Sequence, residues 1–193
     1  MTIGYHVVFG AYGFWLPNDP RGSWSEFVGS WDLYKYGPAT KVDDTRSVAH
    51  RSHDRTIRLA AKNAILHLPV HFTDDQTASV ATGFAKYVAA SKLVVWACAI
   101  MPNHVHLVVA FHDLKIESLI IQLKGQATRA LTDAGIHPFG HIEKPTPKCF
   151  ARGEWKVYLY PEDIPRAIAY VENNPVKEGK PKQYWPFVVP YHN

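Results

Sequence analysis

Two histidines lie two positions apart, at His104 and His106, directly after a Pro-Asn pair that favours a turn. The residues that follow the pair, HVHLVVAF, favour a β-strand, in which side chains at positions i and i+2 point to the same face. Both imidazoles would therefore project together and could bind one divalent metal ion, for which histidine is a common ligand. The alternative is that both are surface residues on a half-exposed strand. The other histidines, such as His6 and His137, show no paired spacing and are assigned no role.

A second group of residues that could carry out chemistry lies in the segment DIPRAIAYVENNPVKEGK. There Tyr170 and Asn174 are one helical turn apart and would share a face. We expect this helix to end at Pro175, because proline disfavours helical backbone in the residue before it. The amide of Asn174 could then reach outward and bind a metal through its oxygen, with Tyr170 near the same ion. The alternative is that the tyrosine only flanks an apolar helix face, which consists of Ile164, Ala167, Ile168 and Val171.

The hydrophobic pattern predicts the elements that must position these residues. Strands are expected at residues 4–12, 93–101, 104–111 and 155–160, and helices at residues 56–66, 74–91, 116–134 and 161–174. This order predicts an α+β fold that approximates the ferredoxin-like, split βαβ plan, a sandwich with helices on one face of an antiparallel sheet. We treat residues 1–193 as one domain. Residues 13–55, rich in Gly, Pro, Asp and Asn, are expected to form an insertion.

The composition is that of a soluble globular protein, with 47% hydrophobic and 20% charged residues. We find no membrane-spanning stretch and no secretory signal, so we expect a cytoplasmic protein. The net charge is +4, and 21 Lys and Arg accompany 6 Trp, 10 Tyr and 9 Phe. This mixture permits binding of unpaired bases, although the aromatic rings could equally fill the core. The sequence contains no CxxC pair that would predict a cysteine zinc site. It also contains no glycine-rich phosphate loop that would predict a nucleotide cofactor.

Three motifs in order along the chain resemble those of the single-tyrosine HUH transposases, in particular the REP-associated tyrosine transposases. They are MPNHVHLVV at residues 101–109, LKG at residues 123–125 and YVENNPV at residues 170–176. The resemblance extends over residues 93–180 and the first strand. It implies a ferredoxin-like catalytic domain of the HUH endonuclease type, with Mg²⁺ or Mn²⁺ as cofactor and single-stranded or hairpin DNA as partner.

The resemblance also implies a role for each motif residue. His104 and His106 would be metal ligands, and Asn174 the third ligand, where related insertion-sequence enzymes have a Gln. Tyr170 would be the nucleophile that forms a 5′-phosphotyrosine and releases a 3′-hydroxyl, which later rejoins the strands in DNA transposition. The resemblance assigns no general base, and Lys124 or Lys177 could assist the reaction. Residues 13–55 exceed what a minimal domain of this type needs.

We further expect a DNA-binding surface formed by the insertion and by the helix at residues 116–134. The residues expected to contact DNA, through stacking rings and phosphate-pairing cations, are Trp15, Arg21, Trp24, Lys124 and Arg129. The alternative is that the insertion packs over the sheet and buries its tryptophans.

Three other functions remain open. A domesticated relative could bind DNA hairpins without catalysis, and a metal-dependent hydrolase could cleave without a covalent step. A relaxase or replication initiator could use the same chemistry, although such proteins are usually parts of larger chains. The sequence leaves both a monomer and a homodimer possible.

Overall fold

The computed structural model describes residues 1–14, 33, 35, 36 and 54–192. Within these residues the centre of the fold is a four-stranded antiparallel sheet with the order β2-β3-β1-β4. The strands are β1 (Gly4–Gly10), β2 (Val95–Ile100), β3 (His104–Ala110) and β4 (Trp155–Leu159). This order and the helical connections between the strands confirm the predicted α+β, ferredoxin-like fold.

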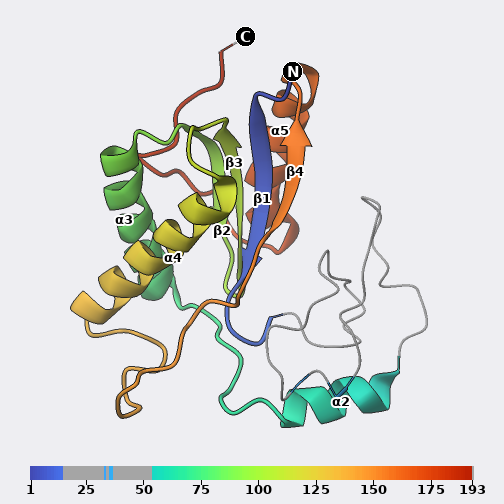
Figure 1. The fold of residues 1–193 in the computed structure, drawn as a ribbon, viewed down its shortest axis with the longest axis vertical. Coiled ribbons are helices and arrows are strands. Elements are labelled where there is room, and N and C mark those ends of the chain that lie inside the picture. Colours follow the sequence, from blue (N-terminus) through green and yellow to red (C-terminus); the bar gives the residue numbers. More distant parts are fainter. Residues whose placement is uncertain (15–32, 34, 37–53, 193) are drawn as a thin grey trace.

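Helices cover both faces of the sheet (Figure 1). Helices α3 (Asp74–Ser91) and α4 (Ile116–Asp133) pack on one face, over a core that includes Phe9, Phe84 and Leu123. Helix α5 (Ile164–Lys177) packs on the other face, where its Val171 shares a second core with Ala97 of β2 and Val108 of β3. The expectation that the helices lie on one face is therefore wrong for α5. The physical reason is that β2 and β3 carry apolar residues on both faces, and both faces must be covered.

The crossing of α3 and α4 depends on Gly83. A Cβ at this position would lie 2.6 Å from the Cα of Ala127 on α4, so the two backbones can approach this closely only with glycine on α3. The close approach seals the face of the sheet opposite to α5.

Most predicted elements agree with the structure to within a few residues. Helix α3 begins as expected, where the side chain of Thr73 accepts a hydrogen bond from the backbone of Gln76 and the Gln76 side chain accepts one in return. Helix α2 (Arg55–Asn63) begins after Asp54, whose side chain accepts a hydrogen bond from the backbone N–H of Ile57.

In the part of the chain that the structure describes, no helix is long and apolar enough to span a bilayer. The predicted insertion at residues 13–55 falls almost entirely outside the described residues, as do Trp15, Arg21 and Trp24.

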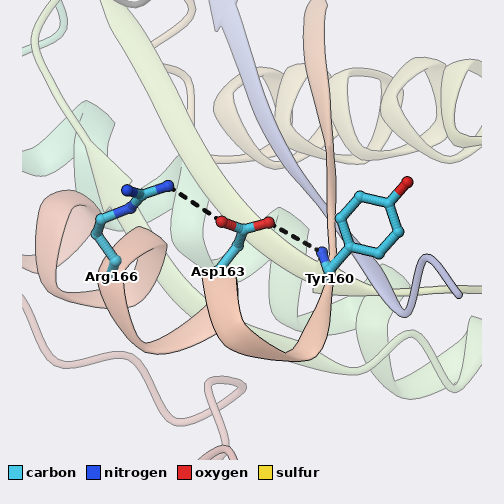
Figure 2. Close-up of polar contacts among 3 residues, drawn as sticks. All are labelled: Tyr160, Asp163 and Arg166. Carbon is cyan, nitrogen blue, oxygen red and sulfur yellow. Dashed lines mark hydrogen bonds and ion pairs between the residues drawn. The ribbon is translucent and has the colours of Figure 1, made fainter.

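A short 3-10 turn, η1 (Pro161–Asp163), leads from β4 into α5. Asp163 fixes this junction, because one of its carboxylate oxygens accepts from the backbone N–H of Tyr160 and the other accepts from Arg166, at 3.3 and 3.0 Å (Figure 2). The expected end of the helix at Pro175 is wrong, since α5 continues to Lys177. A proline this close to the C-terminal end forfeits only one intrahelical hydrogen bond, and the N–H of Glu178 still bonds the carbonyls of the last turn.

Candidate active site

His104 and His106 extend from β3 toward the face that α5 covers. Their neighbour Val105 points into the core under α3 and α4, whereas Val108, on the same face as the histidines, packs under α5. The ring centroids of the two histidines are 4.8 Å apart, with the rings nearly perpendicular. The strand therefore brings the two imidazoles together, as the i, i+2 spacing predicts.

His6, on the adjacent strand β1, is a member of this group that the sequence analysis missed. Its Nε2 lies 3.2 Å from Nδ1 of His106, and the two side chains are only 7% and 6% exposed. The antiparallel register sets His6 opposite Val108, on the same face of the sheet as His106. The available signal was the location of His6 in a predicted strand, but the sequence does not say which strand pairs with β1.

Tyr170 on α5 completes a cluster of rings. Its ring centroid lies 5.6 Å from that of His6 and 5.8 Å from that of His106, in edge-to-face arrangements. Trp155 on β4 also meets His6 edge to face, at 5.2 Å. The Tyr170 side chain is 45% exposed, so the phenol lies beside the buried histidines and still reaches solvent.

Asn174 and Lys177 follow Tyr170 on the same helix. The side-chain amide nitrogen of Asn174 donates to the backbone carbonyl of Tyr170 at 2.9 Å, so the amide folds back onto α5. Of its two polar side-chain atoms, Oδ1 is the one with metal-binding chemistry. The ammonium of Lys177 lies 4.6 Å from the centroid of the Tyr170 ring and adds positive charge to the site.

Burial favours the uncharged forms of His6 and His106. It lowers the pKa of His6 to about 4, because the protonated ring would lose its hydration. Burial also lowers the pKa of His106 well below its usual value, and the positive charges of His104, His6 and Lys177 lower it further. A neutral imidazole has one nitrogen lone pair available, which metal binding requires.

The donor set of this cluster fits a divalent metal ion. Nδ1 of His104 lies 2.7 Å from Oδ1 of Asn103, and the ring stacks on Phe14 with centroids 4.7 Å apart, so the ring orientation is fixed. Nδ1 of His106 contacts His6. An ion would therefore be bound through the Nε2 atoms. Among the described residues, no group of three or more His, Cys, Asp and Glu side chains is suited to a metal. The third ligand that the resemblance implies, Asn174, is an amide.

Two of the cations expected to contact DNA lie on α4, on the opposite side of the sheet from the histidines. Arg129 is exposed there. Lys124, which was also expected to contact DNA, turns inward instead. Its Nζ donates to the backbone carbonyls of Ala151 and Gly153, at 3.0 and 2.5 Å, and lies 4.9 Å from the ring centroid of Phe9. Burial lowers the pKa of Lys124 to about 8.

This placement gives Lys124 a structural role, which a substitution can test. We expect Lys124→Ala to lower the free energy of unfolding by about 2–4 kcal/mol, because two carbonyls lose their donor and the alkyl chain leaves a void. Urea denaturation followed by circular dichroism would measure the decrease. Lys86→Ala, at an exposed position on α3, is the matched control and should change stability by less than about 0.5 kcal/mol. Equal stability of both variants would contradict this role.

No model of a known protein family matches this sequence, and no curated protein matches it. Among solved structures, a REP-associated tyrosine transposase bound to a REP hairpin is similar in structure, with 14% sequence identity and a TM-score of 0.49. The similarity covers 97% of this chain and 76% of that one. A candidate transposase from Deinococcus radiodurans R1 is also similar, with 12% identity and a TM-score of 0.43, over 90% of this chain and 91% of that one. The function therefore has to follow from the chemistry of the site.

Proposed function

We propose that this protein is a single-tyrosine transposase of the HUH type, which cleaves and rejoins single-stranded DNA through a 5′-phosphotyrosine intermediate. The observation that carries the proposal is the contact between Tyr170 on α5 and His106 on β3, with ring centroids 5.8 Å apart. Two elements far apart in the sequence thus bring a phenol beside a histidine pair. A nucleophile next to potential metal ligands is the combination that metal-assisted attack on a phosphodiester needs.

In the proposed reaction, Oη of Tyr170 attacks the phosphorus of the scissile bond. The O–P bond to tyrosine forms and the bond from phosphorus to the 3′ oxygen breaks, so that the downstream strand becomes attached through its 5′ phosphate. The phenol gives up its proton and the departing 3′ oxygen gains one. The released 3′-hydroxyl can then attack the phosphotyrosine and rejoin a strand. The covalent bond conserves the energy of the phosphodiester, so ATP is not required.

Other residues of the site would support this attack. A phenol is a weak nucleophile until its proton is removed or its anion is stabilised. The ammonium of Lys177, 4.6 Å from the Tyr170 ring, would stabilise the phenolate and attract the phosphate. Lys124 is not suited to this task, because its amine is bound to carbonyls on the other side of the sheet.

His104, His106 and Asn174 would hold the divalent ion, Mg²⁺ or Mn²⁺. When bound, it supplies neutralisation of phosphate charge and orientation of the scissile bond. Two imidazole ligands favour Mn²⁺ over Mg²⁺, so we propose that Mn²⁺ binds more tightly.

The polarity of the covalent link provides the test. The probe is a pool of single-stranded oligonucleotides, each with a hairpin, taken from the DNA that flanks the gene. With Mn²⁺, a 3′-end label should migrate with the protein on a denaturing gel, while a 5′-end label should appear on a shorter free strand. Binding without cleavage would favour the non-catalytic hairpin-binding protein instead. Cleavage without an adduct would favour a hydrolase.

The cations proposed to contact DNA include Arg21, in the insertion predicted from the sequence, and Arg129 on α4. We expect Arg21→Ala and Arg129→Ala each to weaken binding to these oligonucleotides, because each removes a cation that pairs with a phosphate. The slope of log affinity against log salt concentration should become shallower by about 0.7 for each phosphate of a single strand that is no longer neutralised. Fluorescence anisotropy across a salt series measures this slope. Lys86→Ala is the control for removal of an exposed charge on the neighbouring helix, and a double arginine variant that binds like the wild type would contradict this surface.

A further inference from the structure

We propose that His6 is a positioning residue that holds His106 in the ring orientation and tautomer needed to bind a metal ion through Nε2. The proposal rests on the metal site of the proposed function. Its basis is the 3.2 Å distance between Nε2 of His6 and Nδ1 of His106, two side chains that are both more than nine-tenths buried.

The chemistry of the contact depends on which nitrogen carries the proton. A neutral imidazole has one N–H donor and one acceptor nitrogen. If Nδ1 of His106 carries the proton and donates to Nε2 of His6, then Nε2 of His106 keeps its lone pair for a metal. The opposite tautomer would place a proton on Nε2 of His106 and prevent coordination there. A partner that accepts from Nδ1 therefore selects the metal-binding form of His106, as partners of metal-bound histidines generally do.

His6 is well placed to act as such a fixed acceptor. It lies in β1, which is paired on both sides, with β3 and with β4. Its ring is further held by edge-to-face contacts with Trp155 and Tyr170, at centroid distances of 5.2 and 5.6 Å. A buried polar ring is costly unless it is hydrogen-bonded, so the contact with His106 compensates for the burial of both histidines. The ring of His6 thus links the strand of the proposed ligands to the helix of the proposed nucleophile.

Two substitutions separate the hydrogen bond from the packing. His6→Phe keeps a ring of similar size but removes the acceptor, whereas His6→Gln keeps an acceptor oxygen. We expect His6→Phe to weaken Mn²⁺ binding by about 10–100-fold, the usual effect of removing the partner of a metal-bound histidine. His6→Gln should retain much more of the affinity. Isothermal titration calorimetry with Mn²⁺, in the absence of DNA, measures both. His137→Phe, at another buried histidine, is the matched control and should bind Mn²⁺ like the wild type.

The tautomer can be measured independently in the metal-free wild-type protein. Long-range ¹H–¹⁵N NMR of the imidazole rings should show the proton of His106 on Nδ1. A proton on Nε2 would overturn the proposal, even if His6→Phe failed to fold. Equal Mn²⁺ affinity of wild type and His6→Phe would also overturn it, while leaving the metal site intact. If the wild type itself bound no Mn²⁺, the metal site and the role of His6 would fall together, whereas the test for a phosphotyrosine adduct would still stand separately.

Discussion

Tyr170→Phe is expected to abolish DNA cleavage while leaving DNA binding nearly unchanged. The substitution removes Oη, the proposed attacking atom, and keeps the ring that contacts His6 and His106 at centroid distances of 5.6 and 5.8 Å. Removal of a covalent nucleophile lowers the rate by several orders of magnitude, so we expect a decrease on the order of 10⁴-fold or more. Because the side chain is 45% exposed, the melting temperature should change little.

Single-turnover cleavage of 3′-labelled hairpin oligonucleotides, with the adduct resolved on a denaturing gel, measures this decrease. Tyr160→Phe is a closely matched control, since Tyr160 lies just before η1, the turn that leads into α5, and is 46% exposed. It should cleave and form the adduct like the wild type. A Tyr170→Phe variant that still formed the adduct would assign the nucleophile to another residue and overturn the proposed mechanism.

The hairpin that carries the histidine pair was the most predictable part of the fold. Its strands are apolar runs on either side of Pro102 and Asn103, and the expected bounds differ from β2 and β3 by only one or two residues. The side of the sheet that α5 covers was harder to predict. A helix with an apolar stripe must bury that stripe against another element, but the stripe does not identify which face of the sheet the helix covers. The apolar residues on both faces of β2 and β3 indicated that both faces of the sheet must be covered.

The site itself was predictable where spacing along one element determines geometry, and not where it depends on pairing between elements. The shared face of His104 and His106 follows from strand periodicity. His6 joins them only because β1 pairs with β3 in a particular register, which no local pattern reveals. Lys124 turns inward for a similar reason. Its partners are carbonyls of Ala151 and Gly153, which the loop after α4 brings back against the helix.

The second large effect is expected at the histidine pair. His104→Ala and His106→Ala should each remove metal-dependent cleavage, and the double variant should show no measurable Mn²⁺ binding. The reason is that the two rings, with centroids 4.8 Å apart, provide the two imidazole ligands of the proposed site. Asn174→Ala should be milder, because the side chain is partly exposed and its amide nitrogen bonds the preceding turn of α5.

Titration of Mn²⁺ into each metal-free variant distinguishes removal of a ligand from disruption of the fold. His106 is 6% exposed, so His106→Ala also leaves a cavity, and its melting curve must be compared with that of His137→Ala, at a histidine that is 8% exposed. If His106 contributed only through its burial in the core, His106→Ala and His137→Ala would both lower the melting temperature. Neither variant would then change the Mn²⁺ affinity of the folded protein. If His106 is a ligand, its removal should reduce affinity by more than the roughly 10–100-fold expected for removal of a hydrogen-bonding partner such as His6. Unchanged Mn²⁺ affinity in the double histidine variant would exclude this pair as the metal site and leave Tyr170 to act without it.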